Sequence, residues 1–164
     1  MSMREILFRG KRIDNGEWIE GTPFQEYNNF WGEWLWFIQT KHPLTNVPYL
    51  HLEIDKKTVG QFTGLTDKNG KKIFEGDIFP IEDEIIAVVI FKNGCFRMEE
   101  YGLCGAWTES GFDECGGGWG IIECCPIDWY NIIDMEVIGN IHDNPELLGG
   151  VNDYEQRMWM CSLQ

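Results

Sequence analysis

The fold is decided by residues 85–98, which read Ile-Ile-Ala-Val-Val-Ile-Phe-Lys-Asn-Gly-Cys-Phe-Arg-Met. The run of β-branched and aromatic residues that comes first is too short and too uniformly apolar for a surface helix. We therefore interpret residues 85–91 as a central strand that is buried on both faces. Asn93-Gly94 follows, and both residues tolerate the positive φ of a type I′ turn. The stretch predicts a hairpin that pairs residues 85–91 with residues 95–98.

The same dipeptide occurs twice more, as Asn15-Gly16 and Asn69-Gly70, each time between segments rich in branched and aromatic residues. Each copy predicts a further hairpin for the same reason. The predicted strand pairs are residues 6–13 with 17–21 and residues 59–63 with 71–78.

Helical signals are scarce in this sequence. The one good helix start is Asn144-Pro145-Glu146, in which Asn can cap, Pro suits the first helical position and the acid complements the helix dipole. We expect one short helix near residues 145–148, ended by Gly149-Gly150. Residues 134–141 alternate like another strand, so the chain is predicted to be mainly β.

Two stretches interrupt the pattern of strands. Residues 24–50 are rich in aromatic residues, and residues 102–120 hold seven glycines, a composition that predicts a long loop. Around residues 31–37 the nearby charge is Glu33, whereas surfaces that bind nucleic acid interleave aromatic rings with Arg or Lys. We expect these rings to pack in a core or, if they are exposed on one face, in a subunit contact.

The chain of 164 residues carries a formal charge of −14, which is unevenly spread. Residues 98–164 contain Arg157 as their only basic residue against 13 acidic ones. Such a surface repels phosphate backbones and anionic lipid, so we expect neither nucleic-acid nor membrane binding. A local basic patch would draw on Arg4, Arg9, Lys11 and Arg12, or on Lys68, Lys71 and Lys72.

The six cysteines include no Cys-x-x-Cys pair and no neighbouring histidine at the spacing of a zinc finger. The N-terminal Met-Ser-Met-Arg-Glu is not followed by an apolar signal core. We therefore expect a cytoplasmic protein with reduced thiols, which are buried as small hydrophobic side chains. We expect no metal ion and no other cofactor.

Sequence motifs for catalysis are missing as well. The Gly-rich residues 102–120 lack the Gly-Lys-Ser/Thr ending of a P-loop. Of the three histidines, His142 has a close acidic neighbour in Asp143, and we expect it to bond its own turn. We identify no catalytic, cofactor-binding or metal-binding residues.

Residues 59–78 read VGQFTGLTDKNGKKIFEGDI. This segment closely resembles the signature of the YopX family, small proteins encoded by phages and prophages. Residues 4–11 together with Trp18 match as well, and so do residues 137–147, in the order that the family has. Residues 24–50 and 100–128 do not match the shared pattern.

The resemblance implies SH3-like small barrel elements with long loop insertions, oligomer formation, and a bacterial or phage-infected cytoplasm. It implies one YopX-like β domain over residues 1–148, with insertions at about 24–50 and 100–128. We expect the tail, residues 149–164, to pack on the body of the protein or on a neighbouring subunit. No catalytic residue is carried over from the family.

The residues shared with the family suit a scaffold. Gly64 and Gly70 fall where strands turn, and Asp67 can accept hydrogen bonds from turn amides. The functional alternative is a candidate recognition edge in the same segment. Its residues are Thr63, Gly64, Asp67, Lys68, Lys71 and Lys72.

We expect a non-enzymatic phage or prophage accessory protein, an oligomeric β scaffold or protein-binding module that binds another protein through its acidic C-terminal half. One alternative is an acidic DNA mimic that inhibits a host DNA-binding protein, which requires the carboxylates of residues 98–146 to lie on one exposed face. A second is a metal-assisted hydrolase that uses His142 and Asp143. A third is direct nucleic-acid binding through the hairpin at Lys68–Lys72.

Overall fold

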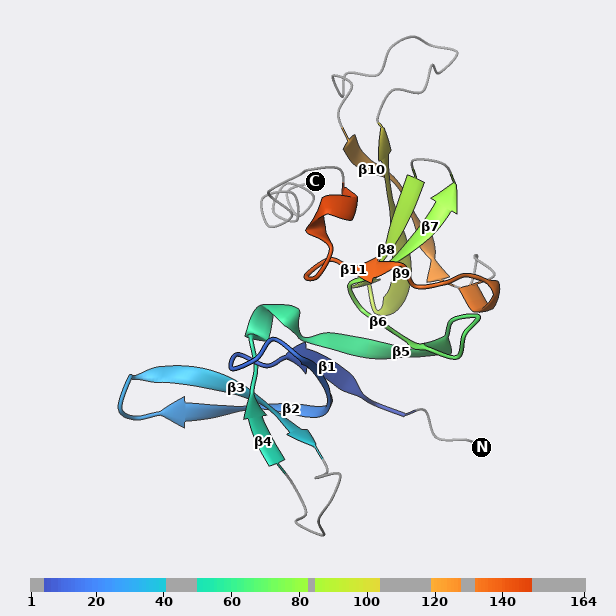
Figure 1. Ribbon diagram of the computed structural model, residues 1–164. Helices are drawn as coiled ribbons and strands as arrows, with labels where there is room; N and C mark the ends of the chain where they lie inside the picture. The colour runs from blue at the N-terminus through green and yellow to red at the C-terminus, as the bar shows by residue number, and fades with distance from the viewer. Residues whose placement is uncertain (1–4, 41–49, 83–84, 104–118, 128–131, 149–164) are drawn as a thin grey trace. The chain divides into compact units, whose positions relative to one another are not determined.

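The strands of the protein form two antiparallel sheets, as the computed structural model shows (Figure 1). The structure describes residues 5–40, 50–82, 85–103, 119–127 and 132–148. The chain divides into two compact units. Unit 1 consists of Met1–Thr66 and Lys72–Glu75, and unit 2 of Asp67–Lys71 and Gly76–Gln164. The mainly β prediction is confirmed, with no helix of seven or more residues in the described chain.

Unit 1 contains a six-stranded sheet in the order β4-β3-β2-β1-β5-β6. Its strands are β1 (Phe8–Lys11), β2 (Trp18–Asn28), β3 (Glu33–Thr40), β4 (Leu50–Glu53), β5 (Gly60–Thr66) and β6 (Lys72–Phe74), with the 3₁₀-helix η1 (Lys56–Thr58) before β5. The core is formed by apolar side chains from β3, β5 and β6 and from the residue that follows β4: Ile38, Ile54, Phe62, Ile73 and Phe74 are all buried.

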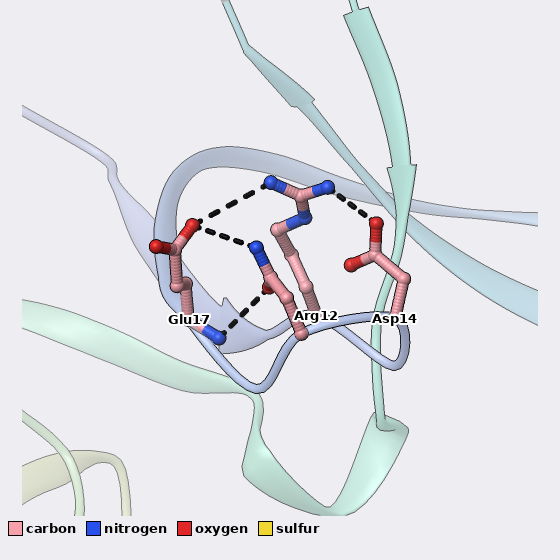
Figure 2. A network of polar contacts seen from close by, with 4 residues as sticks. Arg12, Asp14 and Glu17 are labelled. Carbon is pink, nitrogen blue, oxygen red and sulfur yellow. Dashed lines mark hydrogen bonds and ion pairs between the residues drawn. The ribbon is translucent and has the colours of Figure 1, made fainter.

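The first predicted hairpin is confirmed as β1 paired with β2, from Phe8 opposite Gly21 to Lys11 opposite Trp18. The turn is wider than type I′, because only Gly16 has positive φ, at 72°. Side chains close the loop: the Arg12 guanidinium pairs with Asp14 and lies 3.7 Å from the Glu17 carboxylate (Figure 2). The side-chain NH2 of Asn15 donates to the Glu17 carboxylate at 2.7 Å, and its side-chain oxygen accepts from the backbone N–H of Glu17 at 3.0 Å. These side-chain contacts stabilise a loop that lacks the two positive φ angles of a type I′ turn.

Gly21 shows why β2 carries a glycine beside the core. A Cβ at this position would lie 2.7 Å from Cγ2 of Ile38 and would overlap the carbonyl oxygen of Gln39 on the neighbouring strand. Ile38 is fully buried, so the clash has no free volume to relax into.

Unit 2 contains a five-stranded sheet in the order β10-β9-β8-β7-β11. Its strands are β7 (Asp77–Glu82), β8 (Ile85–Lys92), β9 (Cys95–Leu103), β10 (Trp119–Pro126) and β11 (Gly139–Asn140), accompanied by the 3₁₀-helices η3 (Ile132–Asp134) and η4 (Pro145–Leu148). One core cluster joins Ile78, Val88, Tyr101 and Leu148.

The hairpin predicted at Asn93-Gly94 is confirmed as β8 paired with β9. Its turn has positive φ at both central residues, 56° for Asn93 and 81° for Gly94, as a type I′ turn requires. Ala87, Val88 and Val89 are consecutive and fully buried, so both faces of this central strand are covered as predicted. Phe91, near the turn, is half exposed.

Two predicted strands are shorter than expected. The second hairpin forms, as β5 with β6, but the arm predicted over residues 71–78 is broken at Gly76, where φ is 84°, and Asp77 begins β7 of the other sheet. The strand predicted over residues 134–141 is reduced to β11. Its first residues leave the ladder because the backbone N–H of Val137 donates to the Asp67 carboxylate.

The insertion predicted over residues 24–50 is not a loop throughout. Residues 24–40 lie mainly in β2 and β3, which pair in continuous antiparallel register. The reason is that their aromatic and branched residues have high strand propensity. Residues 41–49 lie outside the described residues.

The short helix is confirmed as η4, a single 3₁₀ turn that Asn144 begins by bonding Glu146 through its side chain and Leu147 through its carbonyl. The prediction of buried cysteines is wrong for Cys95, which is exposed because it follows the β8–β9 turn directly. The other five cysteine side chains, the glycines of residues 104–118 and the tail, residues 149–164, lie outside the described part of the chain.

Gly21→Ala should lower the free energy of unfolding by about 3 kcal/mol, because the new methyl group meets a backbone carbonyl and a buried side chain. Gly16→Ala is the matched control, since a Cβ there has no neighbour within 4 Å and only the left-handed backbone is penalised. That cost is about 1 kcal/mol. Urea denaturation followed by circular dichroism measures both, and equal losses would contradict the packing argument.

Candidate functional site

Asp67, from the predicted recognition edge, is a buried carboxylate that organises unit 2. Its Oδ1 accepts hydrogen bonds from the backbone N–H groups of Asn69 at 2.8 Å and Lys71 at 2.9 Å, and its Oδ2 accepts one from Val137 at 3.3 Å. Burial alone would raise the pKa of this carboxyl, but the three donors outweigh burial and hold the pKa below its ordinary value. The Asp67 carboxylate therefore stabilises its own turn through Asn69 and Lys71, and it connects that turn to the segment before β11 through Val137.

Two of the three lysines in this region are paired with acids. Lys68 Nζ lies 2.7 Å from the Glu136 carboxylate within unit 2, and the same contact lowers the pKa of Glu136. Lys72 Nζ lies 2.9 Å from the Glu20 carboxylate within unit 1, and this hydrogen bond raises the pKa of Lys72. The charge of Lys71 helps to lower the pKa of the nearby Asp67 carboxyl, so little positive charge in this region is left for a phosphate backbone.

The remaining residues of the predicted edge shape the bulged strand β5. The Thr63 hydroxyl donates to the Ile73 carbonyl at 3.0 Å and accepts from the Leu65 N–H at 3.1 Å. Gly64 has a φ of 90°, at the shift of register between β5 and β6. Thr63, Gly64 and Lys72 belong to unit 1, whereas Asp67, Lys68 and Lys71 belong to unit 2. Each described contact is structural, and a recognition role for these six residues stays a prediction.

A different surface presents its functional groups outward: the end of the β2–β3 hairpin, residues 27–34, which we call the hairpin tip. Four aromatic side chains there are exposed to solvent. Their exposed fractions are 47% for Tyr27, 90% for Phe30, 65% for Trp31 and 61% for Trp34. Large apolar side chains gathered in this way at a protein surface mark an interaction site.

Asn28 fixes the backbone of the hairpin tip. Its side-chain oxygen accepts from the N–H groups of Phe30 at 2.9 Å and Trp31 at 3.2 Å, and its carbonyl accepts from Gly32 at 2.8 Å. Gly32 supplies the positive φ, 71°, that closes the loop. Three consecutive backbone N–H groups of the turn are bonded to Asn28, so the rings are presented on an ordered backbone.

The rings of the hairpin tip are tilted against one another. Tyr27 and Trp34 lie opposite each other on the two strands, with ring centroids 5.3 Å apart and planes 60° apart. Phe30 and Trp31 are 6.0 Å apart at 75°. Rings set at these angles form an uneven apolar surface and not the flat platform on which a sugar or a base stacks.

The charge of the hairpin narrows its possible ligands further. Between Gly21 and Thr40 the charged residues are Glu26 and Glu33. A nucleic acid or an anionic membrane would be repelled by them. Exposed Trp and Tyr on an ordered backbone are the residues that carry most of the binding energy in protein–protein contacts.

The sequence analysis noted the aromatic residues of this segment but did not predict that they form a β-hairpin with exposed rings at its end. The signal that could have found it is alternation: Trp34, Trp36 and Ile38 occupy every second position, as one face of a strand does. Within the part of the chain that the structure describes, no group of three or more His, Cys, Asp or Glu side chains could hold a metal ion.

Comparison with known proteins identifies a family. The model of the YopX protein family matches residues 7–149. Among solved structures, the chain is similar to the crystal structure of protein EF1440 from Enterococcus faecalis, with 25% sequence identity and a TM-score of 0.38. That match covers 89% of this chain and 99% of the other. The search of curated proteins gave no match.

Asp67→Ala should destabilise the protein by about 1–3 kcal/mol, because it leaves three backbone N–H groups without their acceptor. Asp67→Asn should lose less, since its carbonyl oxygen can still accept from Asn69 and Lys71. Because the folded pKa is lowered, the wild-type stabilisation is present above about pH 4 and is lost as the pH falls through the folded pKa.

Thermal unfolding of the three proteins at several pH values measures this contribution. The stability gap between wild type and Asp67→Asn should narrow in acid. A gap that is constant from neutral pH to acid would contradict the role of the charged carboxylate.

Proposed function

The chain belongs to the YopX family, and from that membership we propose that it is a non-enzymatic phage- or prophage-derived accessory protein that acts by binding protein chains. The single observation that carries this proposal is the hairpin tip, which exposes four aromatic rings on a backbone fixed by Asn28. Preorganised rings lose little entropy on binding, which favours a contact surface.

The proposed binding surface is the hairpin tip, whereas the sequence analysis predicted binding through the acidic C-terminal half. Two described carboxylates of that half are engaged within unit 2. Glu99 is buried and accepts a hydrogen bond from the Tyr101 hydroxyl at 2.5 Å, and Glu136 pairs with Lys68. A DNA mimic needs such carboxylates free on one face, so these contacts favour the aromatic surface over mimicry.

The hydrolase alternative has little support from the described residues. The backbone N–H of His142 donates to the Asn140 side chain at 3.0 Å, in the turn that follows β11. Asn140 in turn donates to the buried carboxylate of Asp77 at 3.2 Å. These contacts shape a turn and bring no metal ligands together around His142.

The proposed location is the cytoplasm of a bacterial host or phage-infected cell, as the family implies. In the described chain, no helix has the length and apolarity needed to cross a membrane.

The test is affinity capture from an infected or prophage-induced host with the full-length protein. Wild type should recover a protein partner, and the double variant Phe30→Ser/Trp31→Ser should lose it, because the two most exposed rings are removed while Asn28 keeps the turn. Ile13→Ser is the control, since Ile13 is also an exposed apolar residue of unit 1 but lies outside the hairpin tip. Equal recovery by all three proteins would refute the proposed surface.

A further inference from the structure

The two acids of the β2–β3 hairpin, Glu26 and Glu33, lie on the same face of the sheet. β2 pairs with β3 without a shift of register, so residues directly opposite each other share a face. β4 continues this face, because Glu53 lies opposite Phe37. We call this surface of unit 1 the acidic face. It carries Phe24, Glu26, Glu33, Leu35, Phe37 and Glu53.

The carboxylates of the acidic face are available to a ligand. Glu26 and Glu33 are exposed, and Glu53 is half-buried. Within the described part of the chain, none of these three carboxylates forms an ion pair. Glu20, earlier in β2, shows the contrast, since Lys72 neutralises it at 2.9 Å. The negative charge of the acidic face is therefore not used within unit 1.

Aromatic rings lie next to one of these carboxylates. Phe24 and Phe37 stack, with ring centroids 5.5 Å apart and planes 23° apart, and His51 meets Phe24 edge-on at 4.7 Å. Glu53 is the cross-strand neighbour of Phe37, so its carboxylate borders the stacked rings. A cation over an aromatic ring is attracted by the ring, and a carboxylate beside it adds an ion pair. This combination suits the side chain of Arg or Lys.

The acids repeat along the strands with the period of an extended chain. Glu53 lies opposite Phe37. Glu26 lies opposite Leu35, two residues nearer the turn, and Glu33 follows after two more residues. A strand rises about 3.4 Å per residue, so one carboxylate occurs about every 7 Å along the strand direction. An extended peptide presents every second side chain to the same side at this spacing.

Resting on the proposed function of this hairpin as a contact for protein chains, we propose that the acidic face binds a basic segment of the partner in extended conformation. The segment has Lys or Arg at every second position. One cation lies over the rings of Phe24 and Phe37 and pairs with Glu53. The next two cations pair with Glu26 and Glu33.

Charge decides between this occupant and others. A second copy of this chain carries a net charge of −14, and a nucleic acid carries a phosphate at every nucleotide, so unpaired carboxylates repel both. An apolar segment would remove the three carboxylates from water without a partner, at a cost in free energy. A basic segment is attracted to the acidic face and neutralises it.

The test is titration of the full-length protein with the blocked peptide acetyl-Arg-Ser-Arg-Ser-Arg-Ser-amide, followed by calorimetry at about 50 mM salt. The peptide should bind, and its affinity should fall as the salt rises to about 500 mM, because the contact rests on opposite charges. The control peptide acetyl-Arg-Arg-Arg-Ser-Ser-Ser-amide has the same charge without the alternation. It should bind severalfold more weakly, since its three cations cannot all face the three carboxylates at once.

The double variant Glu26→Gln/Glu33→Gln removes two charges from the acidic face and keeps its shape. It should weaken binding of the alternating peptide about tenfold, because two of the three ion pairs are lost. Glu5→Gln/Glu146→Gln is the matched control: it removes two exposed acids elsewhere, so the net charge of the protein changes equally. Its affinity should stay within about twofold of wild type. Circular dichroism checks that both variants fold.

An alternating peptide that does not bind, equal affinities for the two peptides, or equal losses in the two double variants would overturn the inference. The proposed function fails by a different readout, which is affinity capture that does not depend on Phe30 and Trp31. A partner captured through those two rings, together with a peptide that does not bind, would leave the proposed function standing and refute only the basic segment.

Discussion

The antiparallel register of β2 with β3 is the constraint on which the binding surface depends. Pairing without a bulge places every second residue on the same side, so the alternation that buries Ile38 also turns Trp34 and Tyr27 outward on that side. A shift of one residue would exchange the two faces and bring Glu26 and Glu33 to the core side. The separation of apolar from acidic surface is therefore a consequence of backbone pairing.

The turns of this protein divide into two kinds by what their polar groups do. At Asp67 the carboxylate is consumed by three backbone donors, and the nearby lysines at 68 and 72 are neutralised by acids. At Asn28 the polar group likewise serves the backbone, but the neighbouring side chains are large rings left in solvent. The first kind of turn builds the fold, and the second presents a surface.

Local signals predicted much of the fold, because hairpins at Asn-Gly pairs depend on neighbouring residues. All three strand pairings form, and the type I′ turn at Asn93-Gly94 follows from its two permissive residues. The strand expected over residues 134–141 does not form in full, because a carboxylate 70 positions away takes the Val137 N–H. Long-range competition of this kind leaves no periodic mark in the sequence. The aromatic residues of the hairpin tip were visible in the sequence, but their exposure depends on where β1 and β4 end.

Carbene footprinting of the full-length protein tests the central claim most directly, because it reports solvent access for individual side chains. When the partner captured from the host is bound, we predict that labelling of Phe30 and Trp31 falls, while labelling of Ile13 stays constant. Labelling of Phe30 and Trp31 that is unchanged by the bound partner would contradict the claim.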